Sequence, residues 1–102
     1  MRTYRTLDQL IQERLSDPER RAQYLDIAVE DYVENGDEAE LLLSIRQVVQ
    51  ADIGFAKLSE TTGLSRESLY KTLSGKGNPK LKTLKEILSA LGYSLYIKKQ
   101  SA

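Results

Sequence analysis

Apolar residues recur at helical spacing along most of this chain, and capping residues divide the periodic pattern into successive helices. At the start of the chain, Thr6 is placed to act as an N-cap. The apolar residues that follow it share one helical face: Leu7, Leu10, Ile11 and Leu15. The pattern predicts a short amphipathic helix in this segment.

Two longer helices are expected next. Asp17 can cap the first of them, and Pro18 suits its first position, where no backbone N–H is needed. Gly36 can take the left-handed conformation that ends many helices, and Asp37 can cap the following one. The apolar stripe of the first helix is Ala22, Leu25, Ala28, Val29, Tyr32 and Val33. The predicted buried face of the second helix, which Gly54 closes, is Leu41, Leu42, Ile45, Val48 and Val49.

The stretch 54–79 is typical of a helix-turn-helix, which presents its second helix to the major groove of DNA. Gly63 interrupts a short helix, and Ser65 can cap a second one. Pro79 then predicts a loop, because it lacks an N–H and pushes the residue before it away from helical angles. The first helix carries Phe55, Leu58 and Thr62, and the inward positions of the second are Leu69 and Leu73.

A last helix is predicted to end at Gly92, with Leu81, Leu84, Ile87, Leu88 and Leu91 on one side. The alternating residues 93–99 predict a short β-strand. No second strand is evident, so the expected partner is the same strand of a second copy across a two-fold axis. Tyr93, Leu95 and Ile97 are then the candidate dimerisation residues. The alternative is a disordered or packed tail.

These elements predict an all-α fold: a helix-turn-helix bundle with an N-terminal helical extension and a short C-terminal β-strand. The length of 102 residues, 40% of them hydrophobic, suits one small domain with such an extension. We divide the chain into an acidic helical region at 1–52, a DNA-binding domain at 53–92, and a C-terminal strand or tail at 93–102.

The residue inventory excludes several functions. The chain has no cysteine and no histidine, which excludes disulfides, thiolate or histidine metal sites and nucleophile–histidine catalysis. No catalytic constellation, cofactor motif or metal-binding motif is recognisable, so we expect neither an enzyme nor a bound cofactor. No apolar run approaches the length of a membrane span, and no signal peptide is visible, so we expect a soluble cytoplasmic protein without a membrane role.

The net charge of zero hides a division of charge between the two halves. Residues 1–52 hold six basic and twelve acidic residues, a net charge of −6, whereas residues 53–102 hold nine basic and three acidic residues, a net charge of +6. The basic half suits a polyanion, and the acidic half suits a basic partner. A simpler interpretation, that charged residues only coat solvated helices, stays open.

The second helix of the helix-turn-helix carries the candidate DNA contacts. Arg66 can donate to both major-groove acceptors of guanine, and Glu67 can accept from the cytosine amino group or orient Arg66. Lys71 and Lys76 are better suited to phosphate, which positions a protein without reading sequence. The predicted DNA-binding set is Ser65, Arg66, Glu67, Ser68, Tyr70, Lys71, Ser74 and Lys76.

The sequence resembles the HigA-like addiction-module antidote proteins, antitoxins with a λ-repressor-like (XRE/Cro-type) helix-turn-helix. The likeness spans nearly the whole chain, and residues 63–79 are its most specific part. The matching residues are Gly63 to Lys71, Leu73-Ser74, Gly77-Asn78-Pro79, Leu88 and Ala90-Leu91-Gly92, with a softer upstream match at Tyr24-Leu25, Ala28, Leu41-Leu42-Leu43 and Ile45. Ser59 lies where such motifs often carry alanine.

The resemblance implies a type II antitoxin. Such proteins neutralise a cognate toxin by direct binding, typically a small basic RelE/ParE-like or mRNA-cleaving protein. They also bind double-stranded operator DNA as a homodimer and repress their own operon. No toxin contact can be carried over from the family, but the acidic half suggests candidates for toxin binding: Glu13, Asp17, Glu19, Glu30, Asp31 and Glu34.

Two other hypotheses remain open. A stand-alone XRE-type regulator would use the same DNA-reading helix and would have no obligate protein partner. A helical adaptor domain would bind no DNA, so that replacing Arg66 or Lys71 would change solubility alone. Because neither histidine nor cysteine is present, an enzyme is a distant fourth.

Overall fold

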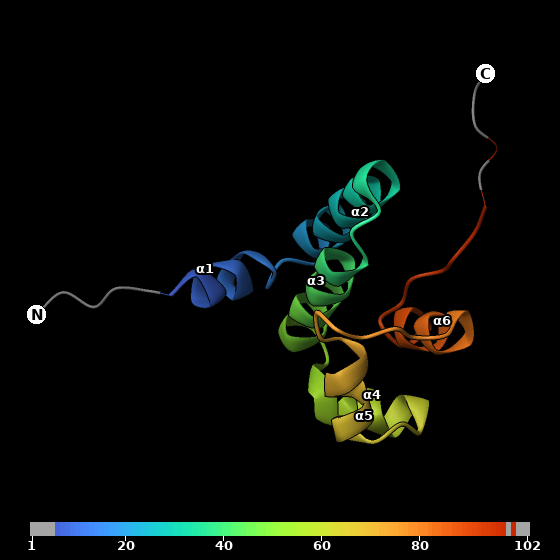
Figure 1. Cartoon of the computed structure of the whole chain (residues 1–102). Helices are drawn as coiled ribbons and strands as arrows, with labels where there is room; N and C mark the ends of the chain where they lie inside the picture. Colours follow the sequence, from blue (N-terminus) through green and yellow to red (C-terminus); the bar gives the residue numbers. More distant parts are fainter. Residues whose placement is uncertain (1–5, 98, 100–102) are drawn as a thin grey trace, which may run out of the picture.

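In the computed structural model, residues 6–97 and 99 are described, and they form six helices (Figure 1). Over this part of the chain no β-strand occurs, so the all-α part of the prediction is confirmed. No helix within it is long and apolar enough to cross a membrane. The helices are α1 Leu7–Arg14, α2 Pro18–Asn35, α3 Glu38–Ala51, α4 Gly54–Thr62, α5 Arg66–Thr72 and α6 Leu81–Ala90.

The capping residues that the sequence indicated begin the first three helices. Thr6 forms a capping box, because its hydroxyl accepts from the Gln9 N–H at 3.1 Å and its own N–H donates to the Gln9 side chain at 2.8 Å. Asp17 caps α2, with proline at the first helical position, and Asp37 caps α3. Gly36 ends α2 at a φ of 71°. These caps are confirmed because each depends on residues close in sequence.

The middle of the molecule is α3, which contacts α1, α2 and α4 (Figure 1). Its buried face is the predicted one, with Val48 and Val49 fully enclosed. Arg21 of α2 ties the junctions around this helix: it donates to the Leu15 carbonyl at 2.9 Å and lies 3.8 Å from the Asp52 carboxylate at the end of α3. The buried core is Leu15, Leu25, Leu42, Ile45, Val48, Val49, Phe55, Leu58, Leu69, Leu73, Ile87 and Leu91.

The apolar faces of the first two helices are only partly buried. Leu15 and Leu25 are enclosed, but Leu7 is 74% exposed and Val33 is 70% exposed. Polar contacts join α1 to α3, since Gln12 donates to Gln47 and Gln47 donates to Asp8, and these contacts leave Leu7 uncovered. Among the described residues, α3 is the helix that packs most extensively on α2, and the outer side of α2 stays exposed. The periodic pattern identifies the apolar face of each helix, but it does not show whether another element packs on that face.

The strand predicted over residues 93–99 is not formed by the described residues 93–97 and 99. A strand needs a neighbour that satisfies its backbone groups, and the described part of this single chain offers none. Instead, the Tyr93 N–H donates to the Leu88 carbonyl at 2.8 Å, and burial raises the pKa of the Tyr93 hydroxyl. Leu95, Tyr96 and Ile97 are 48%, 82% and 99% exposed. Residues 98 and 100–102 lie outside the described part.

The loop after α5 depends on one close approach of the backbone. A Cβ atom at Gly77 would lie 1.9 Å from the carbonyl oxygen of Thr72, the last residue of α5. A carbon atom and a carbonyl oxygen that are not bonded cannot lie that close, so any side chain at residue 77 would push the loop away from the helix. Gly75, two residues earlier, has room, because a Cβ atom there would lie 3.9 Å from Leu43 Cδ1.

We therefore expect Gly77→Ala to lower the free energy of unfolding by about 1–3 kcal/mol, the usual cost of an enforced overlap. Gly75→Ala is the matched control, and it should stay within about 0.5 kcal/mol of the wild type. Urea unfolding followed by far-ultraviolet circular dichroism measures both. Equal stabilities for the two variants would show that the loop yields freely at residue 77.

Candidate nucleic-acid interface

The helices α4 and α5 are joined by a three-residue turn that side chains hold in place. Gly63 has a φ of 77°, in the left-handed region that other residues rarely adopt, and its N–H donates to the Ser59 carbonyl at 2.9 Å. The Ser59 hydroxyl donates to the Leu64 carbonyl at 2.5 Å, and the Thr62 hydroxyl accepts from the Leu64 N–H at 3.2 Å. Ser59, which lies where such motifs often carry alanine, thus fixes the turn.

Ser65 opens α5 as predicted. Its hydroxyl accepts from the Ser68 N–H at 3.1 Å and donates to the Ser68 hydroxyl at 3.0 Å. Leu69 and Leu73 are fully buried and dock the helix on the core. Because its inner side is fixed in this way, α5 turns its polar side outward, and the exposed members of the predicted set are Ser65, Arg66, Glu67, Ser68, Tyr70, Lys71 and Lys76.

Ser74 differs from the rest of the predicted DNA-binding set. It is half-buried, and its hydroxyl donates to the Lys71 carbonyl at 2.8 Å and accepts from the Lys76 N–H at 3.3 Å. The hydroxyl therefore closes the end of α5 and shapes the following loop. Lys71 and Lys76 remain exposed on either side of it.

Tyr70 is held by an aromatic contact that sequence reasoning missed. Its ring stacks on the buried ring of Phe55 at a centroid distance of 4.3 Å and an interplanar angle of 19°. The guanidinium carbon of Arg46 lies over the Tyr70 ring, 5.3 Å from its centroid. Arg46 belongs to α3, twenty residues before the start of α5, so local spacing gave no signal for this contact.

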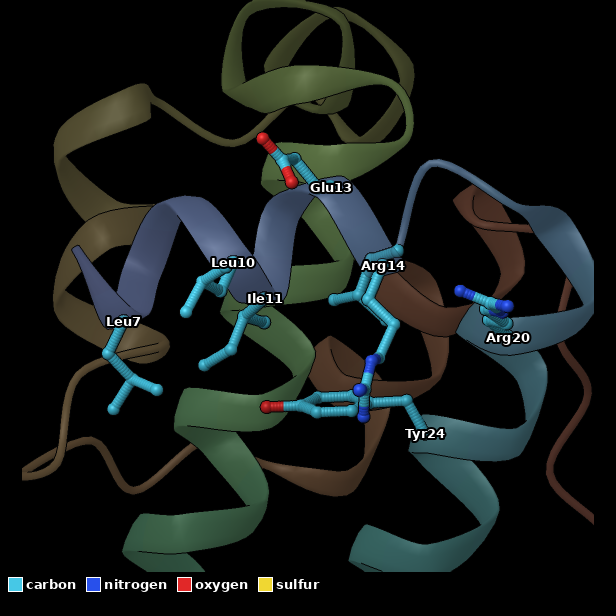
Figure 2. A pocket seen from close by; sticks show the side chains of 8 residues that line it. Leu7, Leu10, Ile11, Glu13, Arg14, Arg20 and Tyr24 are labelled. Atoms are coloured by element: carbon cyan, nitrogen blue, oxygen red, sulfur yellow. The ribbon is translucent and has the colours of Figure 1, made fainter. Parts of the chain in front are cut away.

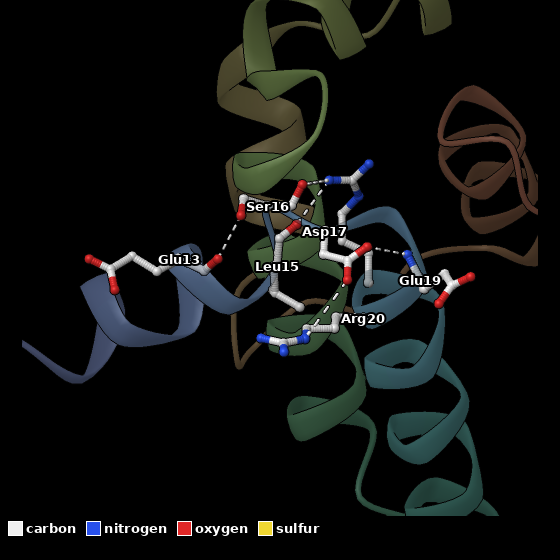
Figure 3. A network of polar contacts seen from close by, with 7 residues as sticks. Glu13, Leu15, Ser16, Asp17, Glu19 and Arg20 are labelled. Carbon is white, nitrogen blue, oxygen red and sulfur yellow. Dashed lines mark hydrogen bonds and ion pairs between the residues drawn. The ribbon is translucent and has the colours of Figure 1, made fainter.

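The six acidic residues predicted to bind a toxin do not form one cluster. Glu13, Asp17 and Glu19 lie around the junction of α1 and α2, where Asp17 accepts from the Glu19 N–H at 3.1 Å and lies 3.8 Å from Arg20 (Figure 3). Another group of three lies near the other end of α2, more than ten residues and about 15 Å away along the helix. That group is Glu30, Asp31 and Glu34, all exposed.

An open groove runs between α1 and α2. Figure 2 shows Leu7, Leu10 and Ile11 pointing from α1 toward the ring of Tyr24, whereas Glu13 points to the other side of α1. The lining is mostly apolar and contains no catalytic arrangement. Across the part of the chain that the structure describes, no three acidic, histidine or cysteine residues gather to hold a metal ion.

Comparison with known proteins gives the family. Residues 5–99 match the family described as "Probable addiction module antidote protein". The chain belongs to this family. An uncharacterized protein of Haemophilus influenzae (strain ATCC 51907 / DSM 11121 / KW20 / Rd) is 34% identical over 61 residues, which cover 60% of this chain. The match covers 63% of that relative's length. No solved structure matches, so the λ-repressor-like arrangement stays a prediction.

Loss of the Ser65 cap gives a direct test of how α5 is fixed. We expect Ser65→Ala to lower the free energy of unfolding by about 1 kcal/mol, because the Ser68 N–H loses its acceptor. Ser89→Ala, at an exposed serine of α6, is the control and should change stability by less than about 0.5 kcal/mol. Thermal unfolding measures both, and an unchanged Ser65→Ala variant would contradict the capping role.

Proposed function

We propose that this protein is the antitoxin of a type II toxin–antitoxin module, a cytoplasmic protein that neutralises a cognate toxin by direct binding. The observation that carries the proposal is the match to an antidote family over residues 5–99, almost the whole chain. We further propose that the protein binds operator DNA as a homodimer and represses its own operon. No enzymatic activity, cofactor or membrane role forms part of the proposal.

The shape and charge of α5 support DNA binding. This short helix is capped by Ser65, anchored by two buried leucines and polar on its outer side, as a helix that reads the major groove must be. In this proposal Arg66 and Glu67 read base edges, while Lys71 and Lys76 hold phosphates. The net charge of +6 over residues 53–102 favours approach to a polyanion.

The outer side of α2 is the part that we assign to the toxin. Val29 and Val33 are 47% and 70% exposed there, and the acidic residues Glu30 and Glu34 directly follow them in sequence. An apolar ridge edged by carboxylates fits a partner with an apolar groove and a basic rim. Glu30, Asp31 and Glu34 are thus better candidates than Asp17, whose carboxylate already caps α2.

Dimerisation through the tail is the third part of the proposal. The exposed side chains of Leu95 and Ile97 offer apolar area that the single chain does not cover. Pairing of two tails across a two-fold axis would bury it and would match a palindromic operator. Tyr93 would contribute less, because it already packs on the core of its own chain.

The neighbouring gene provides the test of the antitoxin role. We expect the protein encoded beside this chain to arrest growth when expressed alone, and to co-purify in a stoichiometric complex when both are expressed. Val33→Asp, which places a charge on the proposed α2 ridge, should weaken the complex, whereas Leu81→Asp at an equally exposed leucine of α6 should not. Absence of both toxicity and a complex would favour the alternative, a stand-alone XRE-type regulator.

DNA reading is tested on the DNA upstream of the gene for this chain. Arg66→Ala should lower affinity for the operator by about 1–3 kcal/mol at the base pair that it reads. Lys71→Ala should instead weaken binding to all duplexes alike, with a smaller salt dependence. Fluorescence anisotropy with operator and scrambled duplexes separates the two effects. An Arg66→Ala variant that prefers the operator as strongly as the wild type would remove Arg66 from the reading set.

A further inference from the structure

Arg46 lies beside the proposed DNA-reading helix although it comes from α3. Its guanidinium is 5.3 Å from the centroid of the Tyr70 ring, a distance at which a cation is attracted to an aromatic face. One turn earlier on α3, Leu43 lies against the loop that follows α5, since its Cδ1 would be 3.9 Å from a Cβ atom at Gly75. Arg46 and Leu43 therefore bring this side of α3 next to Tyr70 and to the loop after α5.

No carboxylate of the described residues pairs with the Arg46 guanidinium. Among the residues that the structure describes, the ion pairs are those of Arg20, Arg21 and Lys57, and none involves Arg46. Arg46 is half-buried, so its side chain is restricted by its neighbours and yet still reaches solvent. A cation that is held in place and not neutralised by a carboxylate is available to an anion from outside.

The stack gives this cation a fixed position relative to α5. Phe55 is buried in the core and stacks on the 43% exposed Tyr70 ring, so this ring serves as a platform anchored to the core. Arg66 lies one helical turn before Tyr70, which places it on the same edge of α5. Arg46 thus contacts Tyr70 from the α3 side, and Arg66 shares the helix face on which Tyr70 lies.

We propose that Arg46 is a phosphate-binding residue of the DNA interface, held by the Tyr70 platform so that it contacts the phosphodiester backbone beside the groove that α5 enters. This inference rests on the proposed DNA binding and extends it to a helix outside the helix pair. In it, Tyr70 is a positioning residue that orients Arg46. The guanidinium suits the task because its planar face can rest on the ring while its N–H groups donate to phosphate oxygens.

Salt dependence is the measurement that identifies a phosphate contact. Binding of the full-length protein to a fluorescein-labelled random-sequence duplex of about two helical turns is followed by anisotropy between about 50 and 200 mM salt. Arg46→Ala should weaken binding and reduce the slope of log affinity against log salt by about 0.9 for each bound copy. Arg14→Ala is the matched control, since it removes an equal charge from an exposed position on α1.

The possible outcomes are distinct. A shallower slope for Arg46→Ala together with a wild-type slope for Arg14→Ala supports the proposal. Equal slopes for Arg46→Ala and the wild type overturn it, as does an equal reduction in both variants, which would reflect net charge alone. Failure of the wild type to bind any duplex would overturn DNA binding itself, and Arg46 with it. If Arg46→Ala does not fold, Arg46→Gln, which keeps the stem and a planar amide, replaces it with the same expectations.

The role of the Tyr70 ring in positioning Arg46 has its own test. Tyr70→Leu removes the ring and should lose the part of the slope that Arg46 supplies, whereas Tyr70→Phe, which keeps the ring, should lose less of it. In the Arg46→Ala background, Tyr70→Leu should reduce the slope no further, because both substitutions act on one contact. Additive reductions would show that Tyr70 contacts the backbone independently and does not act through Arg46.

Discussion

Burial of one face of α3 is the interaction on which the rest of the structure depends. Ile45, Val48 and Val49 have at most 1% of their surface exposed, and burying such a side chain contributes about 1.5–3 kcal/mol. Since α1, α2 and α4 all pack on this helix, its position determines theirs. The opposite edge of the same helix carries Leu43 and Arg46 to the side of α5, so one element supplies both the core and part of the candidate interface.

Local features of the fold were predictable from sequence, and features that need a distant partner were not. The caps at Thr6, Asp17 and Ser65 follow from residues within a few positions, and all three occur. The sequence pattern shows the apolar stripe of α2 but not that Val29 and Val33 stay exposed, because covering them requires an element that the described chain does not supply. The predicted C-terminal strand fails for the same reason, since a strand alone cannot satisfy its backbone.

The candidate site, too, has some features that the sequence predicts and others that it does not. The outward residues of α5 could be read from its spacing, because Leu69 and Leu73 set which side faces the core. The contact of Tyr70 with Phe55 and Arg46 could not, since it joins three helices whose order in space only tertiary packing decides. For the acidic half, sequence gave the charge but not its distribution, which the structure separates between the two ends of α2.

Because helices from both halves of the chain pack on α3, this helix also determines how the protein unfolds. The hydrophobic core is one cluster running from Leu15 to Leu91, so it includes residues from both the acidic and the basic half. Neither half can lose its structure without exposing the side of α3 that the other needs, which favours a single cooperative opening over separate local ones. A cellular protease that captures the opened chain would therefore destroy both candidate surfaces in one event.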